Sequence, residues 1–166
     1  LMDCGAPHGM EFSSTHALTI RRIEGGILGN GTDITPDMTP FEAGLAPFVN
    51  MEKGDFIGRT ALLKKDRQCC LFGLTCRTET PAAGARVFDG GTEVGRITAG
   101  IPSPTLGLGI GYVHLNAPGD WVGRTLAMRL PNGSLHGAQI VQPPFFDPDK
   151  KIVRGLDRSI PQRPAN

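Results

Sequence analysis

The first regular pattern along the chain has a helical period. Four apolar residues recur at intervals of three or four positions: Ala17, Ile20, Ile23 and Ile27. This spacing places them on one face of a helix. Ser13 or Ser14 can cap its first turn, and Gly25–Gly26 can end its last turn. We therefore predict one amphipathic helix over about residues 14–24, with that apolar face buried.

A second helix is predicted after an irregular, proline-containing connection. Asp55 is a good cap for a helix over residues 56–65, and Lys64–Lys65 would lie at its negative end. In this helix Ile57, Ala61 and Leu62 would face inward. Between the two helices, Glu42 is interpreted as a local cap or hydrogen-bond partner rather than as an acid–base catalyst.

Beyond Gln68 the period of apolar positions falls to about two, which is typical of strands. Glycine or proline turns separate the segments, and Asp89–Gly91 and Pro131–Gly133 are the clearest hairpin signals. Six short strands are predicted, over residues 70–76, 86–88, 93–99, 109–115, 125–130 and 137–141. So many short strands favour a small closed barrel or a sandwich. The fold class is therefore α+β, with a short α/β segment followed by a small antiparallel β-structure.

Composition narrows the possible functions. Lys and Arg number 17 against 16 Asp and Glu, a balance that argues against bulk attraction to nucleic acid or to a membrane surface. No apolar run approaches the roughly 20 residues of a membrane helix. The 4 cysteines and the scattered histidines have no metal-ligand spacing, so no metal site is predicted. Reduced thiols of this kind suit a cytosol-like compartment.

The stretch from Ile20 to Ile34 combines charges within a helical apolar pattern, a run of glycines and a final carboxylate. It is the candidate ligand-binding segment. The glycine run lacks the spacing of a nucleotide loop and does not follow a strand. A simpler alternative is that Arg22 and Glu24 lie on a solvated helix surface and that Asp33 only supports a turn.

Several motifs in order resemble the folate-dependent aminomethyltransferase family, whose namesake is the T-protein of the glycine cleavage system. The first half carries Arg21-Arg22-Ile23-Glu24-Gly25-Gly26, Asp33-Ile34, Thr39-Pro40, Glu42-Ala43-Gly44-Leu45 and Lys53-Gly54-Asp55-Phe56-Ile57-Gly58. The second half carries Val94-Gly95-Arg96-Ile97-Thr98-Ala99-Gly100, Ser103-Pro104-Thr105-Leu106 and Pro144-Phe145-Phe146. The double arginine, and Asp147 where many T-proteins have a basic residue, look more like the branch that demethylates sulfonium or N-methyl compounds.

The resemblance implies the carboxyl-terminal part of a tetrahydrofolate-dependent enzyme that moves one-carbon units from an aminomethyl or methyl donor. It implies four folate- or substrate-binding residues: Arg22, Glu24, Asn30 and Asp33. Arg22 would reach a pocket through a free head group, and Asn30 stands where the family often has a tyrosine. No catalytic residue is assigned, because the family's catalytic aspartate would precede Leu1, and we expect this chain alone to be inactive.

The resemblance also implies domains and partners. Residues 1–66 would complete the folate-binding domain, residues 67–155 would form the carboxyl-terminal barrel, and residues 156–166 would form a tail. Tetrahydrofolate would be the cofactor, a small donor the substrate, and a lipoyl carrier protein a further partner, in the cytoplasm or the mitochondrial matrix. The alternative is a non-catalytic barrel module used for docking or structural support.

Overall fold

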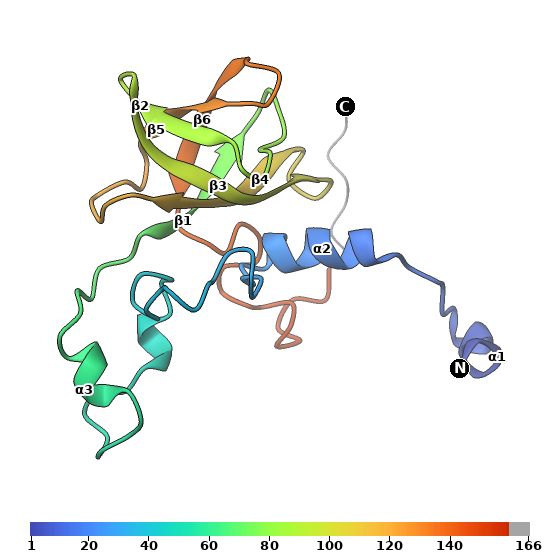
Figure 1. The fold of residues 1–166 in the computed structure, drawn as a ribbon. Helices are drawn as coiled ribbons and strands as arrows, with labels where there is room; N and C mark the ends of the chain where they lie inside the picture. Colours follow the sequence, from blue (N-terminus) through green and yellow to red (C-terminus); the bar gives the residue numbers. More distant parts are fainter. Residues whose placement is uncertain (160–166) are drawn as a thin grey trace.

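The computed structural model describes residues 1–159, which form a β-barrel with helical segments along one side (Figure 1). The helical elements are α1 (Met2–Gly5), η1 (Ala6–His8), α2 (Thr15–Glu24), η2 (Ala46–Phe48) and α3 (Arg59–Leu62), where η marks a 3-10 turn. The strands are β1 (Leu71–Cys76), β2 (Arg86–Asp89), β3 (Thr92–Ser103), β4 (Leu108–Leu115), β5 (Thr125–Arg129) and β6 (Leu135–Val141). Of the predicted tail, residues 160–166 lie outside the described residues.

The strands form a closed antiparallel barrel in the order β1-β4-β3-β2-β5-β6, with β6 pairing back onto β1. This confirms the predicted fold class and decides between the barrel and the sandwich. Both predicted hairpins form. Gly90 and Gly91 connect β2 to β3 at φ of 53° and 94°, a left-handed conformation that glycine adopts without a side-chain clash. Closure leaves no exposed sheet edge.

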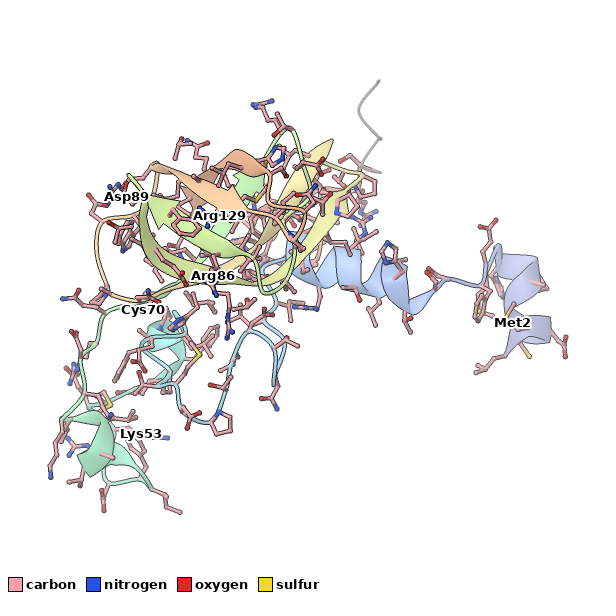
Figure 2. All side chains as sticks on the ribbon, turned by 45° about the horizontal axis from the view of Figure 1, so that its top comes forward. Met2, Lys53, Cys70, Arg86, Asp89 and Arg129 are labelled. Carbon is pink, nitrogen blue, oxygen red and sulfur yellow. The ribbon has the colours of Figure 1, made fainter. Side chains whose placement is uncertain are left out.

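The amino-terminal arm and the segment around α3 lie away from the barrel. Figure 2 shows Met2 in α1 and Lys53 near α3 at opposite ends of the molecule. Among the described residues, α3 contacts no other helix or strand. The predicted helix over residues 56–65 is wrong in length and in orientation: α3 spans one turn, Gly58 rather than Asp55 precedes it, and Ile57 is 104% exposed. The apolar positions could not hold a longer helix because no element of the described chain packs against them.

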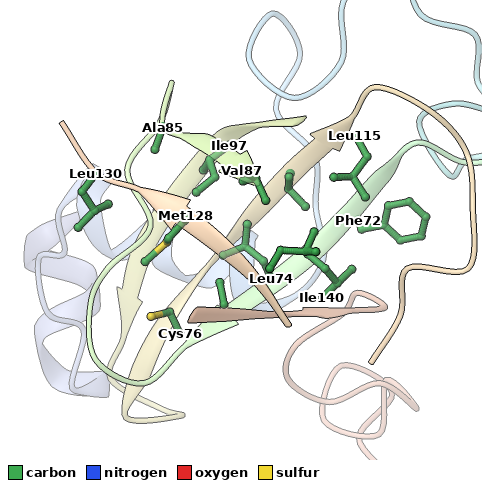
Figure 3. Close-up of a cluster of buried hydrophobic side chains, with 13 residues drawn as sticks. Phe72, Leu74, Cys76, Ala85, Val87, Ile97, Leu115, Met128, Leu130 and Ile140 are labelled. Atoms are coloured by element: carbon green, nitrogen blue, oxygen red, sulfur yellow. The ribbon is translucent and has the colours of Figure 1, made fainter. Parts of the chain in front are cut away.

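The main hydrophobic core fills the barrel interior (Figure 3). Every strand contributes to it, and β1, β4, β5 and β6 do so with alternate residues, as the pleat requires. Its buried members are Phe72, Leu74, Cys76, Ala85, Val87, Ile97, Val113, Leu115, Leu126, Met128, Leu130, Ala138 and Ile140. A second, smaller core lies between α2 and the outside of the barrel and consists of Ile23, Leu71, Ala99, Ile101, Ile110 and Tyr112.

A β-bulge in β3 allows one strand to serve both cores. The pairing with β4 shifts between Ile97 and Ala99, so Thr98 is the extra residue. Before the bulge Ile97 points into the barrel, and after it Ala99 and Ile101 point outward toward α2. Bulges commonly re-aim side chains in this way. Here the bulge directs Thr98 toward the segment that follows α2.

Helix α2 agrees closely with the prediction. The hydroxyl of Ser14 accepts from the Ala17 amide at 3.3 Å, and the chain turns at Gly26, whose φ is 76°. Ile23 is buried, whereas Ile27 is 61% exposed because it lies beyond this turn. The prediction that Ile27 shares the buried face is therefore wrong. No helix in the described part of the chain has the length and apolar character needed to cross a membrane.

Candidate functional site

A partly buried ion pair connects the two ends of the candidate segment. Nη1 of Arg22, in the last turn of α2, lies 2.9 Å from Oδ2 of Asp33. The same nitrogen donates to the carbonyl of Ile27 at 3.1 Å. The Arg22 side chain is 25% exposed, whereas that of Asp33 is wholly buried. The expected free head group of Arg22 is therefore engaged within the chain.

The carboxylate of Asp33 has a partner on each oxygen. The Gly29 amide donates to Oδ2 at 2.7 Å, and the Thr98 hydroxyl donates to Oδ1 at 2.6 Å. Gly29 suits this position, because a Cβ there would lie 2.4 Å from the Thr32 hydroxyl. Asp33 thus joins the end of α2, the glycine loop and the bulge of β3. This arrangement stabilises the shape of the loop without leaving a buried charge unpaired.

Glu24 makes a second contact between α2 and the barrel, at a different part of the barrel. Its carboxylate accepts from the Ser103 hydroxyl at 2.6 Å and from Nη1 of Arg21 at 3.1 Å. Its backbone carbonyl accepts from the amides of Phe145 and Phe146. Glu24 therefore connects α2 to the end of β3 and to the segment after β6. Every buried side-chain nitrogen or oxygen in the described part of the chain has a hydrogen-bond partner.

A cleft of about 590 Å³ opens beside the carboxyl-terminal end of α2. Its walls are largely apolar and come from the residues after α2, from η2 and from the segment after β6; they include Ile27, Leu28, Leu45 and Phe48. Lys150 lies at its edge, where Nζ donates to the Gly25 carbonyl at 2.7 Å. This contact places a cation at the negative end of the helix.

Tyr112 forms part of the inner wall of this cleft. Its hydroxyl lies 3.3 Å from the carbonyls of both Ile23 and Ile27, to which it donates. Burial raises the pKa of Tyr112 well above its ordinary value, and the nearby Asp33 charge adds to this effect. The phenol therefore stays protonated and serves as a hydrogen-bond donor that shapes the loop.

A second cleft, of about 530 Å³, has Asp33 in its wall and is lined mainly by polar and charged residues. Thr98, Arg96 and His114 of the barrel face Asp37 and Glu42 of the connection across it. Glu42 and Thr39 exchange hydrogen bonds: Oε2 accepts from the Thr39 amide at 2.7 Å, and the Glu42 amide donates to the Thr39 hydroxyl at 3.2 Å. This reciprocal capping box confirms the interpretation of Glu42 as a local cap. The bond from the Thr39 amide lowers the pKa of Glu42.

The structure brings two of the four predicted site residues into contact, Arg22 and Asp33. Glu24 does not contact them through its side chain and instead accepts a hydrogen bond from Ser103. Asn30 is exposed, bridges to Ile34, and lines neither of the two clefts. Contact of these four residues with folate stays a prediction.

Sequence reasoning did not place four residues that hold or line the site beside the candidate segment: Thr98, Ser103, Tyr112 and Lys150. Thr98 and Ser103 do lie within the quoted barrel motifs, but their direction depends on a bulge and on a strand end, which a period of two does not reveal. Tyr112 reads as an ordinary core residue. Lys150 is 125 residues from Gly25 in the sequence, so only the folded chain brings the two into contact.

Comparison with known proteins gives a consistent result. Residues 67–147 match the family described as glycine cleavage T-protein C-terminal barrel domain. An aminomethyltransferase of Saccharopolyspora erythraea is 34% identical over 152 residues, covering 88% of this chain and 41% of that protein. A 4-methylaminobutanoate oxidase (formaldehyde-forming) of Paenarthrobacter nicotinovorans is 32% identical over 161 residues, covering 93% of this chain and 19% of that protein.

A solved structure is similar as well. The crystal structure of the glycine cleavage system aminomethyltransferase T from Bartonella henselae matches with a TM-score of 0.67 and 31% sequence identity, covering 77% of this chain and 37% of that one. This chain therefore spans about two fifths of the length of such aminomethyltransferases. It belongs to the aminomethyltransferase family, in which it corresponds to a carboxyl-terminal part that includes the barrel domain.

Proposed function

We propose that this chain forms one wall of a site for tetrahydrofolate-dependent one-carbon transfer. The observation that carries the proposal is the anchoring of the Arg22–Glu24 motif to the barrel beside an apolar cleft of about 590 Å³. The carboxylates of Glu24 and Asp33 bind side chains of the barrel, so the backbone of this segment is held in place. A ligand would meet a preformed wall rather than a mobile segment.

The residues that are present fit a folate. Folates combine flat rings with carboxylates, and the cleft combines apolar walls with a cation. Ile27, Leu28 and Phe48 would pack against the rings, and Lys150 would pair with a carboxylate. Arg22, which keeps a quarter of its side chain exposed, is the second candidate cation. When bound, tetrahydrofolate supplies the nitrogen that receives the one-carbon unit, and this chain's residues bind and orient it.

The donor is proposed to be an aminomethyl or an N-methyl compound. The match to aminomethyltransferases favours the first, with a lipoyl carrier protein as the partner that would present the aminomethyl group. The match to a 4-methylaminobutanoate oxidase over 93% of the chain favours the second. The Arg21–Arg22 pair and Asp147, which depart from the T-protein pattern, also favour an N-methyl donor.

Calorimetric titration of tetrahydrofolate tests the proposal. We would titrate it into this chain and into a longer form that includes the portion expected before Leu1. Binding to the longer form alone, with activity there only, is the expected result. Binding to neither would overturn the folate proposal and favour the alternative, a barrel module used for docking or support. Cytoplasmic or mitochondrial-matrix location would be checked by fractionation.

Arg22→Ala in the longer form should weaken folate or substrate binding by about 1–3 kcal/mol, the usual range for loss of a charged hydrogen bond. Because Arg22 also pairs with Asp33, thermal unfolding must show that the variant is folded at the assay temperature. Arg154→Ala, at an exposed position outside both clefts, is the matched control. Unchanged affinity in a folded Arg22→Ala protein would remove Arg22 from the site.

A further inference from the structure

A row of three arginines crosses neighbouring strands on the outside of the barrel. Arg86 of β2 lies directly opposite Arg96 of β3 on one side and directly opposite Arg129 of β5 on the other. Residues directly opposite one another in antiparallel strands project to the same face. All three arginines are exposed, and Figure 2 shows Arg86 and Arg129 on the same side of the barrel.

This arginine row does not stabilise the sheet. Like charges placed directly opposite each other in antiparallel strands are destabilising. Glu93 partly offsets the charge of Arg86, with Oε2 at 3.3 Å from Nη1. Within residues 1–159, Arg96 and Arg129 form no salt bridge. The row therefore carries more positive charge than its single ion pair offsets.

The side chains around the row leave its arginines exposed to solvent. The guanidinium carbon of Arg129 lies 4.3 Å from the centre of the Phe88 ring, so this side chain is stacked flat on the sheet. Asp89 is already paired with Arg124, and His114, which continues the row on β4, faces Glu42 across the polar cleft. Arg96 faces Asp37 and Glu42 across the same cleft but forms no salt bridge with them in the described chain, so Arg96 and Arg129 both keep an unpaired guanidinium. Two strand spacings separate them, or about 10 Å.

The chemistry of the row fits carboxylates. Guanidinium groups pair well with carboxylates, and the Arg86–Glu93 and Arg124–Asp89 ion pairs show that arginines on this surface already bind carboxylates. Nucleic acid fits less well, because it needs an extended face rich in Lys and Arg, whereas the row is short and the whole chain has a net charge of only +1. We propose that the arginine row is a docking surface for an acidic segment of a partner protein.

Fluorescence anisotropy of a labelled oligoglutamate peptide, measured with the full chain at low salt, tests this docking surface. The double variant Arg96→Gln/Arg129→Gln should weaken binding about tenfold, and either single variant about threefold. Arg77→Gln is the matched control, because Arg77 is exposed, follows β1 and lies outside the row. Binding should also weaken as salt rises, since the Debye length is about 10 Å at 0.1 M.

Three results would overturn the proposal. The first is no measurable binding of oligoglutamate by the unaltered chain. The second is equal weakening by Arg77→Gln, which would mean that only the overall charge matters. The third is tighter binding of a labelled oligothymidylate than of oligoglutamate, with dependence on the same arginines, which would assign the row to polyphosphate. The melting temperature of the double variant should not fall, so a lost contact can be told apart from a lost fold.

Discussion

The barrel and the segments before it differ in how their apolar residues are covered. In the barrel, side chains such as Leu74, Met128 and Ile140 are wholly buried within a core that the strands close around. Before the barrel, Phe12, Phe48 and Ile57 are each more than 80% exposed. The barrel supplies its own core, whereas the amino-terminal region packs on the barrel surface through residues such as Ile23, Glu24 and Asp33.

The largest expected effect contrasts the two regions directly. Leu74→Ala would leave a cavity in the closed barrel core and should lower the free energy of unfolding by about 3–4 kcal/mol. Ile57→Ala removes an apolar side chain that is fully exposed and should change it by less than about 0.5 kcal/mol. Urea denaturation monitored by circular dichroism measures both. A cost at Ile57 close to that at Leu74 would show that residues around α3 belong to a packed core.

A smaller effect on the free energy of unfolding is expected at Asp33, where the amino-terminal region contacts the barrel. Asp33→Ala removes the partner of Arg22, Gly29 and Thr98 and should destabilise the protein by about 2–4 kcal/mol. Part of the loss is relieved because Arg22 can reach solvent. The Asp33→Ala/Thr98→Val double-mutant cycle should give a coupling of about 1 kcal/mol. Additive effects would mean that the bulge and the loop are held independently.

The same contrast explains what the sequence predicts. The strands follow from a period of about two together with the turn residues between them, because each strand has one face in the barrel core. Helix α2 follows because Ile23 packs onto Tyr112 and its termini carry Ser14 and Gly26. The helix over residues 56–65 fails because propensity without a packing surface does not hold more than one turn.

The contacts that attach the candidate segment to the barrel are hard to predict for a different reason. The extension of β3 to Ser103 is hidden by Gly100 and Pro102, which ordinarily interrupt strands. The charged motif pointed to Arg22 and Asp33, but their pairing depends on an 11-residue separation across a glycine loop. Contacts between distant segments, such as Thr98 with Asp33, have no local signature.

Loss of the second contact, between Ser103 and Glu24, should lower the free energy of unfolding by less. Ser103→Ala removes the hydroxyl that donates to the buried Glu24 carboxylate at 2.6 Å and that accepts from the Leu106 amide at 3.0 Å. Arg21 remains beside Glu24, so a loss of about 1–2 kcal/mol is expected. Urea denaturation gives the value, with Ser159→Ala, at an exposed position near the end of the described chain, as the control. Equal values for the two variants would mean that Glu24 does not need Ser103.

The smallest effect concerns Glu42, whose capping box is local to the connection before the barrel. Because the bond from the Thr39 amide lowers its pKa below the ordinary value of 4.5, the ionised form stabilises the fold. That contribution is present above about pH 4.5 and is lost as the pH falls through the lowered pKa. Glu42→Gln should therefore cost about 0.5–1 kcal/mol at neutral pH, and the difference from the unaltered chain should shrink on acidification. Denaturation curves across pH 3–7 for both proteins measure it. A difference that is constant with pH would show that ionisation of Glu42 does not contribute to stability.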